Sequence, residues 1–251
     1  MSLSQLKSDE SEVIEAEVDY VGSSNSGILE SGLYPCFVKV AYLGESSGGA
    51  ITLNIHLNLE ANNREFKTLV YLTSGKAKGQ KKYFEKDGKK SYLPGFNIGN
   101  SLCQLTVDKA IGDMVSEEKF VKIYDFDAKE ELPVAVPVLT ELLNKPIIAG
   151  IVKQLVDKPK NMAAEGQPAN WQPSGETKEQ NEITKFFRAA DGLTTTEILA
   201  GATEASYRES WKDRFTGVTQ NKVKGVPGGA AQSAAAIGTP AAKPVKSLFA
   251  T

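Results

Sequence analysis

The segment 51–60 (ITLNIHLNLE) constrains the fold most, because apolar and polar residues alternate along its whole length. Leu53, Ile55 and Leu57 share one face, and Asn54 and His56 share the other. Side chains of a β-strand point to opposite faces with a period of two residues. The segment therefore predicts a strand with one face in a core and the other in solvent.

Further short runs of β-branched and aromatic residues are separated by clusters of Gly, Ser, Asn and Asp. We expect strands at 33–44, 66–73, 119–127 and 146–156, with a turn at 44–49; the last segment is long enough for a helix to be the alternative. The segment 94–114 has helical spacing. A mainly β chain with one inserted helix predicts a small β-barrel of the oligonucleotide-binding (OB) type. A β-sandwich is the alternative, because periodicity does not show closure.

The composition changes after residue 157, and it suggests five regions. We expect an acidic N-terminal arm (1–12), an OB-like nucleic-acid-binding domain (13–157), a linker rich in Pro, Asn, Gln and Gly (158–175), a helical hairpin (176–216) and a disordered basic tail (217–251). In the hairpin, the first helix covers 179–190. The second begins with a capping box of Thr194 and Glu197, with Leu193 and Ile198 as a hydrophobic staple.

The second helix of this hairpin carries an apolar stripe, which we expect to pack on Phe186 and Phe187 or on another subunit. The stripe recurs at every fourth residue and consists of Leu199, Thr203, Tyr207, Trp211 and Phe215.

Composition argues against several classes of protein. No apolar run approaches the length of a membrane span, and the first residues are acidic where a signal peptide is basic. We therefore expect a soluble, cytoplasmic protein, without a membrane partner. Cys36 and Cys103 lie in apolar segments and are expected to be buried thiols. His56 is the single histidine and the two cysteines are not paired, so the residue sets needed for a zinc site or for nucleophilic catalysis are missing. We therefore expect no cofactor, no metal and no enzyme activity.

The net charge of −2 hides a strong asymmetry along the chain. Residues 1–19 carry six carboxylates against Lys7, whereas residues 64–92 carry nine basic residues against three acidic ones. Lysines and aromatic rings alternate most densely in 75–96 (GKAKGQKKYFEKDGKKSYLPGF). Cations follow the phosphates of single-stranded nucleic acid while rings stack on its unpaired bases, so this stretch predicts a single-stranded DNA (ssDNA) site. The candidate residues are His56, Arg64, Lys67, Lys76, Lys78, Lys81, Lys82, Tyr83, Lys86, Lys89, Lys90 and Tyr92.

A solvated β-hairpin with EKDGKK as its turn is the simpler interpretation of the same stretch. We expect it to hold for Phe84 and Phe96, which should be tucked into the barrel, and we expect His56 to face solvent. The string Gly75–Gly79 lacks the Lys-Ser/Thr pair of a nucleotide-triphosphate loop. Asp125 and Asp127 share a strand face and suggest a metal-dependent nuclease, although an exposed strand end explains them as well.

The chain ends in a short basic and apolar sequence after a stretch of Ala, Gly and Pro. We expect this terminus to act as a tethered partner-recognition peptide through Lys243, Lys246, Leu248 and Phe249. A tail that only adds solubility is the alternative.

The β-rich run from LYPCFVKVAYLG through ITLNIHLNLE to FKTLVYLTSGKAKGQKKYFEKDGKKSYLPGF resembles the ssDNA-binding proteins of tailed bacteriophages, in particular of phages that carry a large virion RNA polymerase. The resemblance covers about 13–156. It implies an OB barrel, ligand contacts at the lysines and tyrosines of 76–92, and roles in replication and phage transcription inside the infected bacterium. Many such proteins end in an acidic tail, whereas this tail is basic, which favours a polymerase cofactor.

The leading hypothesis is therefore a sequence-tolerant ssDNA-binding protein that acts as a homo-oligomer. The second is a structural or regulatory interaction module that uses the helical hairpin and the tail, with a phage RNA polymerase or replication protein as its partner. The nuclease is the third.

Overall fold

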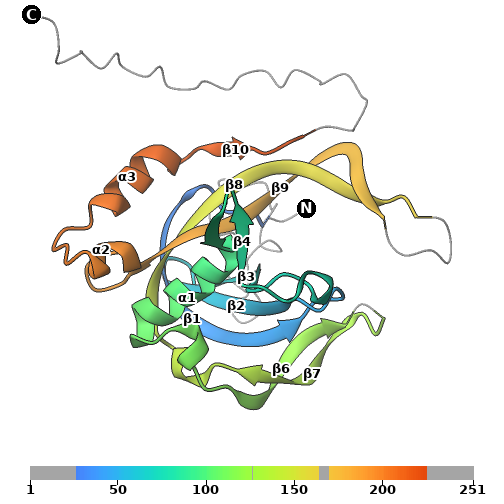
Figure 1. Ribbon diagram of the computed structural model, residues 1–251, viewed down its shortest axis with the longest axis horizontal. Helices are drawn as coiled ribbons and strands as arrows, with labels where there is room; N and C mark the ends of the chain where they lie inside the picture. The colour runs from blue at the N-terminus through green and yellow to red at the C-terminus, as the bar shows by residue number, and fades with distance from the viewer. Residues whose placement is uncertain (1–26, 126, 164–169, 225–251) are drawn as a thin grey trace, which may run out of the picture.

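The computed structural model describes residues 27–125, 127–163 and 170–224, and the fold of this part is mainly β (Figure 1). Its strands are β1 (Gly32–Glu45), β2 (Ile51–Leu59), β3 (Arg64–Tyr71), β4 (Tyr83–Lys86), β5 (Lys89–Tyr92), β6 (Glu117–Asp125), β7 (Glu130–Val138), β8 (Pro146–Asn161), β9 (Trp171–Arg188) and β10 (Thr219–Asn221). Its helices are α1 (Pro94–Val107), α2 (Thr195–Leu199) and α3 (Ser206–Phe215), with short 3₁₀ turns η2 (Lys76–Lys78), η3 (Ile111–Asp113) and η4 (Thr140–Leu142).

Eight of these strands form one large sheet, and β4 and β5 form a separate two-stranded sheet. Along the sheet the order is β10-β8-β1-β2-β3, with β9 on the other edge of β8 and β7 on the end of β1. Every pair is antiparallel except β10 with β8. The predictions of strands near 33–44, 51–60, 66–73, 119–127 and 146–156 and of a helix from residue 94 are confirmed.

The main core lies between the curved sheet and α1. Leu53, Ile55 and Leu57 of β2 are fully buried there, together with Leu102 and Cys103 of α1. The alternation of β2 is not perfect, since Ile51 is exposed at the start of the strand while Thr52 and His56 are buried on the other face.

Both cysteines are free and buried, as expected. The Cys36 Sγ donates to the Ile147 carbonyl at 3.4 Å. Burial raises the pKa of each thiol to about 12, so neither is a nucleophile at neutral pH.

The predicted linker at 158–175 is wrong where the structure describes it. Residues 158–161 continue β8 and residues 171–174 continue β9, so the two strands form one long hairpin (Figure 1). The ladder shifts register at Pro159, which has no N–H to donate. The proline residues that suggested a linker belong instead to an irregular part of this hairpin. No separate domain begins at residue 176.

The predicted helix at 179–190 is also wrong, because β9 runs to Arg188. A β-bulge explains the error. Ile183 pairs with Ile151 and Lys185 with Gly150, so Thr184 is an extra residue on β9. A bulge changes the face of the residues that follow it, and it brings Ile183 and Phe186 into the same core. Ile183 and Phe186 are three residues apart, which is also the spacing of residues on one face of a helix.

The predicted second helix is two helices. The capping box is confirmed: the Thr194 Oγ1 accepts from the Glu197 N–H at 3.3 Å, and the Glu197 Oε2 accepts from the Thr194 N–H at 2.9 Å. However, α2 ends at Leu199, and Gly201 then has a φ of +70°. A left-handed glycine commonly ends a helix, so the chain turns before α3 begins.

The apolar stripe is confirmed only in part. Trp211 is buried edge-on against Phe187, with ring centroids 6.3 Å apart, and Tyr207 and Phe215 pack beside them. Leu199 is 83% exposed, because the helix breaks after it. Phe186 belongs to the main core instead.

Strand pairing shows a large antiparallel sheet, and no closed barrel is formed by the described strands. The predicted disordered tail is wrong at its start, because β10 at Thr219–Asn221 pairs with β8. Within the described ranges, no helix is both long and apolar enough to cross a bilayer. The acidic arm at 1–12 lies outside the described residues.

Candidate nucleic-acid interface

Residues 76–92 project from the molecule as an arm, which we call the lysine arm. It comprises η2 and the β4–β5 hairpin, and its strands join through Asp87 and Gly88. Both turn residues have positive φ, 52° and 71°, the geometry of a two-residue turn that matches strand twist. The sequence EKDGKK therefore forms the turn that the simpler interpretation predicted.

The base of the lysine arm is fixed to the turn between β1 and β2. The Lys76 N–H donates to the Gly48 carbonyl at 2.9 Å, and the Lys76 Nζ binds the Glu45 Oε1 at 2.6 Å. A Cβ on Gly75 would lie 2.6 Å from the Gly48 oxygen, so only glycine permits this approach. The arm is thus anchored at its base while its hairpin extends away.

Rings and ammonium groups are interleaved along the arm. Tyr83 pairs with Tyr92 across the hairpin, and the Lys90 Nζ lies 5.1 Å from the Tyr83 ring centroid. Tyr92 packs on Phe96 with centroids 4.8 Å apart, yet it remains 51% exposed. Phe84 was expected in the barrel, but it is exposed because the hairpin stands clear of the core. Phe96 is half-buried under Tyr92.

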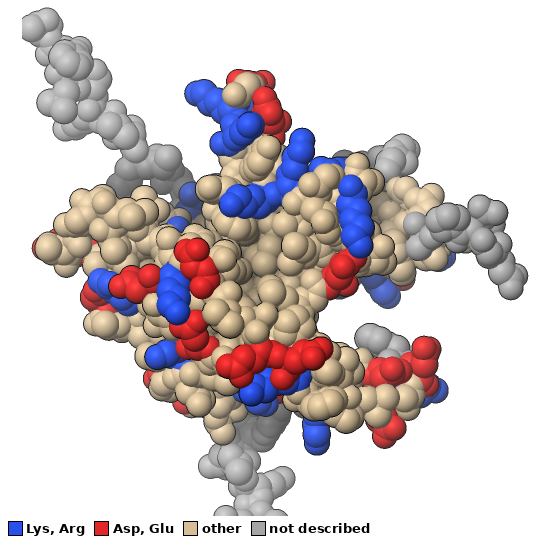
Figure 2. All heavy atoms as spheres, turned by 60° about the horizontal axis from the view of Figure 1, so that its bottom comes forward, with Lys and Arg blue, Asp and Glu red and all other residues tan. Residues whose placement is uncertain are grey.

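The cations of the arm divide into two groups. Lys76 is neutralised by Glu45. Among the described residues, no carboxylate lies within ion-pair distance of the six other lysines, all of which are exposed. These six are Lys78, Lys81, Lys82, Lys86, Lys89 and Lys90. In Figure 2 the tip of the arm is the projection at the top, and blue side chains continue along the surface below it.

Three predicted residues lie apart from the arm, on β2 and β3. Arg64 donates to the Gly27 carbonyl at the far end of β3. Lys67 lies 3.6 Å from Glu131 and 4.0 Å from Glu65. These side chains already have partners, so the structure separates them from the six unpaired lysines.

His56 was expected to face solvent, and it is buried. Its Nδ1 lies 2.9 Å from the Glu65 Oε1, and its ring meets the Tyr42 ring edge-on at 5.7 Å. Burial lowers the pKa of His56, although the hydrogen bond to Glu65 opposes this. Tyr42 of β1 and Glu65 of β3 contact the ring, and the alternation of polar and apolar residues along 51–60 does not predict these contacts.

A second surface, which the sequence did not identify, lies beside the arm. On β3, Leu69 and Tyr71 point away from the core and are exposed. On β6, Phe120 is 79% exposed and Tyr124 is 49% exposed. Directly opposed residues of an antiparallel pair share a face, so Tyr124 lies on the same face as its partner Glu131, which binds Lys67 of β3.

The β6–β7 hairpin therefore turns Phe120 and Tyr124 toward the outward face of β3. We call the surface formed by Lys67, Leu69, Tyr71, Phe120 and Tyr124 the outer groove. Figure 2 shows the molecule hollowed between this hairpin, at the lower right, and the part above it. Tyr71 ends β3, and the lysine arm begins five residues later at Lys76. The alternation of Phe120, Lys122 and Tyr124 was the signal available in the sequence.

Of the two carboxylates suggested for a nuclease, that of Asp125 has a structural role. The Asp125 Oδ1 accepts from the backbone N–H groups of Asp127 and Ala128, at 2.8 and 2.9 Å. Asp125 thus holds the turn between β6 and β7. In the described ranges, no group of three or more His, Cys, Asp or Glu side chains is arranged to hold a metal ion.

The partner-binding residues predicted in the tail, Lys243, Lys246, Leu248 and Phe249, lie outside the described residues. Comparison with known proteins adds no assignment: no protein-family model matches the chain, and no curated protein matches it.

Proposed function

We propose that this protein binds ssDNA with little sequence preference, through the lysine arm and the outer groove. One observation carries the proposal: among the described residues, six exposed lysines without carboxylate partners stand among partly or fully exposed rings on the lysine arm. Clustered unpaired cations repel one another, and a polyanion relieves this repulsion. The rings favour unpaired bases, since every base presents a face for stacking.

The outer groove supports the same ligand. Its exposed rings lie beside the cations Lys67 and Lys122, the combination that single-stranded nucleic acid requires. A strand held by the arm through its phosphates would pass Tyr71 and reach Phe120, each able to stack on a base. Such stacking contributes roughly 1–3 kcal/mol per base.

Strand order supports an OB-type fold for this domain. The sequence β3-β2-β1-β8-β9 along the sheet, with α1 between β3 and β8 in the chain, is compatible with a five-stranded barrel left open between β3 and β9. On this proposal, the lysine arm and the β6–β7 hairpin are insertions. OB domains commonly bind oligonucleotides on the face of strands two and three, here the face of β2 and β3 that borders the outer groove.

The proposed setting is the cytoplasm of a bacterium infected by a phage, where the protein, as a homo-oligomer, protects or presents ssDNA during replication and assists transcription. It acts without catalysis or a cofactor. A role as a cofactor of a phage RNA polymerase or replication protein is the alternative, carried by the basic tail. That alternative also relied on a helical hairpin at 176–216. The hairpin is not formed, because β9 occupies 171–188, so it no longer supports the alternative.

Titration with fluorescent oligonucleotides at several salt concentrations tests the proposal. We expect tight, steeply salt-dependent binding to single strands of different sequences, weaker binding to duplexes, and quenching of intrinsic fluorescence. Absence of binding to single strands at low salt would refute it. Binding to double strands of equal strength would reject the role of the rings.

A further inference from the structure

The strands β3 and β9 each have one free edge, and the two edges face each other. Within the described residues, β3 pairs only with β2 and β9 only with β8. Between them lies a cleft of about 860 Å³, lined by 68–71 of β3, the start of α1 and 180–185 of β9. Free edges expose backbone groups that can pair with another strand. We call this cleft the seam.

The two sides of the seam differ in chemistry. Its inner side has Val70, Ile98 and Ile183, all of which pack in the main core. Its outer side has Lys185, whose Nζ lies 5.2 Å from the Tyr207 ring centroid. In the described part of the chain, no carboxylate forms an ion pair with Lys185, and burial lowers the pKa of this half-buried amine. The seam therefore fits a strand with one apolar and one acidic face.

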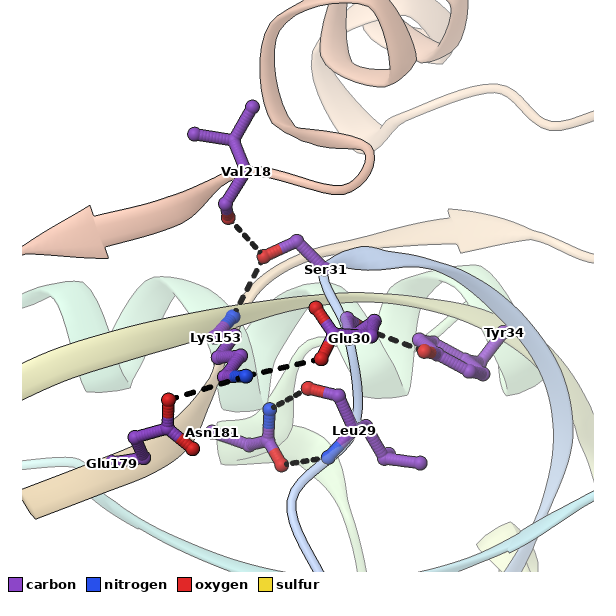
Figure 3. Close-up of polar contacts among 8 residues, drawn as sticks. All are labelled: Leu29, Glu30, Ser31, Tyr34, Lys153, Glu179, Asn181 and Val218. Carbon is purple, nitrogen blue, oxygen red and sulfur yellow. Dashed lines mark hydrogen bonds and ion pairs between the residues drawn. The ribbon is translucent and has the colours of Figure 1, made fainter. Parts of the chain in front are cut away.

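The first described residues contact β9 at one end of the seam, and Figure 3 shows Leu29 beside Asn181 and Glu30 beside Lys153. The Leu29 N–H donates to the Asn181 Oδ1, and the Leu29 carbonyl accepts from the Asn181 Nδ2, both at 2.7 Å. Glu30 binds Lys153, which also binds Glu179, while Arg64 at the start of β3 binds the Gly27 carbonyl. Residues 27–29 thus lie between β9 and the Arg64 side chain at the start of β3.

The sequence just before these residues alternates strictly. Ile14, Ala16, Val18 and Tyr20 are separated by Glu15, Glu17 and Asp19. A period of two residues favours a strand with one apolar and one acidic face. Seven residues extend about 24 Å as a strand, close to the length of β3, and residues 21–26 remain as a connection to Gly27.

We propose that residues 14–20 of this chain add a strand between β3 and β9, with the apolar face on the core and the carboxylates toward Lys185. β3 and β9 run in the same direction, since four antiparallel steps separate them. The added strand runs toward the start of β3 and is therefore antiparallel to both neighbours. It closes the sheet, and this inference does not depend on nucleic-acid binding.

Hydrogen exchange of the full-length protein tests the added strand. In Ile14→Asp/Val18→Asp, we expect the edge amides of β3 to exchange at least about tenfold faster than in the unaltered chain. Leu3→Asp/Leu6→Asp, which makes the same change outside 14–20, should leave them unchanged. Protection of 53–57 in β2 reports whether the fold is intact. Equal rates at the β3 edge in all three proteins overturn the proposal.

Engineered disulfides keep the proposal testable if that variant does not fold. Leu69 faces outward on β3, so it should meet one of the three outward acidic positions. Leu69→Cys combined in turn with Glu15→Cys, Glu17→Cys or Asp19→Cys should give a disulfide within one chain in at least one pair. Leu69→Cys alone is the control. Disulfides between two chains, or none in any pair, overturn it.

Discussion

The salt dependence of ssDNA binding offers the most quantitative test of the lysine arm. For single strands, log K falls with log salt concentration by about 0.7 for each phosphate that a cation neutralises. We consider the substitution of Lys81, Lys82, Lys89 and Lys90 by alanine. If each of the four contacts one phosphate, the slope should become shallower by about 2.8.

This change of slope also fixes the expected loss of affinity. Electrostatic contributions largely vanish near 1 M salt, so a slope difference of about 2.8 corresponds to a several-hundred-fold weaker affinity at about 0.1 M salt. Folding should not change, because the side chains are exposed and the arm forms its own two-stranded sheet. Surface substitutions of this kind usually alter the free energy of unfolding by less than about 0.5 kcal/mol.

A control variant removes the same charge from lysines that already have partners. Lys109, Lys119, Lys158 and Lys212 bind Glu141, Glu117, Glu176 and Glu209, respectively. Their substitution by alanine should leave the slope nearly unchanged, since these cations are already neutralised. Fluorescence anisotropy with one oligonucleotide at five or more salt concentrations measures both variants. Equal slopes in the two variants would refute the assignment of the arm, because net charge alone would then explain binding.

Three further predictions concern the groove, the second core and the buried histidine. Phe120→Ala should weaken ssDNA binding by about 1–3 kcal/mol without a change in salt slope or melting temperature; a parallel loss of stability would make the ring structural. Trp211→Ala should lower the free energy of unfolding by about 3–5 kcal/mol, because this buried ring packs so closely on Gly150 that a Cβ there would lie 3.0 Å from it, and its Nε1 donates to Thr184; a urea titration followed by circular dichroism measures it. The lowered pKa of His56 means that the unfolded chain binds its proton first, so stability should fall as pH drops below about 6.5, the ordinary histidine value. His56→Gln should remove this part of the loss between pH 7 and 5, and an unchanged pH profile in that variant would contradict the assignment.

The sequence predicted the first half of the fold well, because strands such as β2 and β3 carry their buried apolar residues on one face. The segment 51–60 could be assigned from period two alone, and the turn at Asp87 and Gly88 could be assigned from residue type. The capping box at Thr194 was equally local: the residues that satisfy the helix end are within three positions of each other. Such signals do not depend on distant partners.

The errors came from strands whose conformation depends on a distant partner. β9 has helical spacing only because the bulge at Thr184 places Ile183 and Phe186 on one face, and that bulge exists because β8 is its neighbour. β7 escaped detection because it contains Pro133 and Pro137, which are unusual in strands but tolerated where the pairing partner leaves the N–H position free. These features cannot be inferred from local sequence.

The candidate site shows the same division between local and distant information. The sequence has nine basic residues in 64–92, and it does not indicate which of them have acidic partners. The structure divides them into two groups. Arg64 binds the Gly27 carbonyl, Lys67 binds Glu131 and Lys76 binds Glu45. These partners are distant in sequence, so no local pattern predicts them. Among the described residues, the six lysines that remain unpaired all belong to the lysine arm, whose own acidic residues are Glu85 and Asp87. A cation that has no internal partner gains most from an external one, so the ligand site that we propose is the lysine arm and not the whole basic stretch.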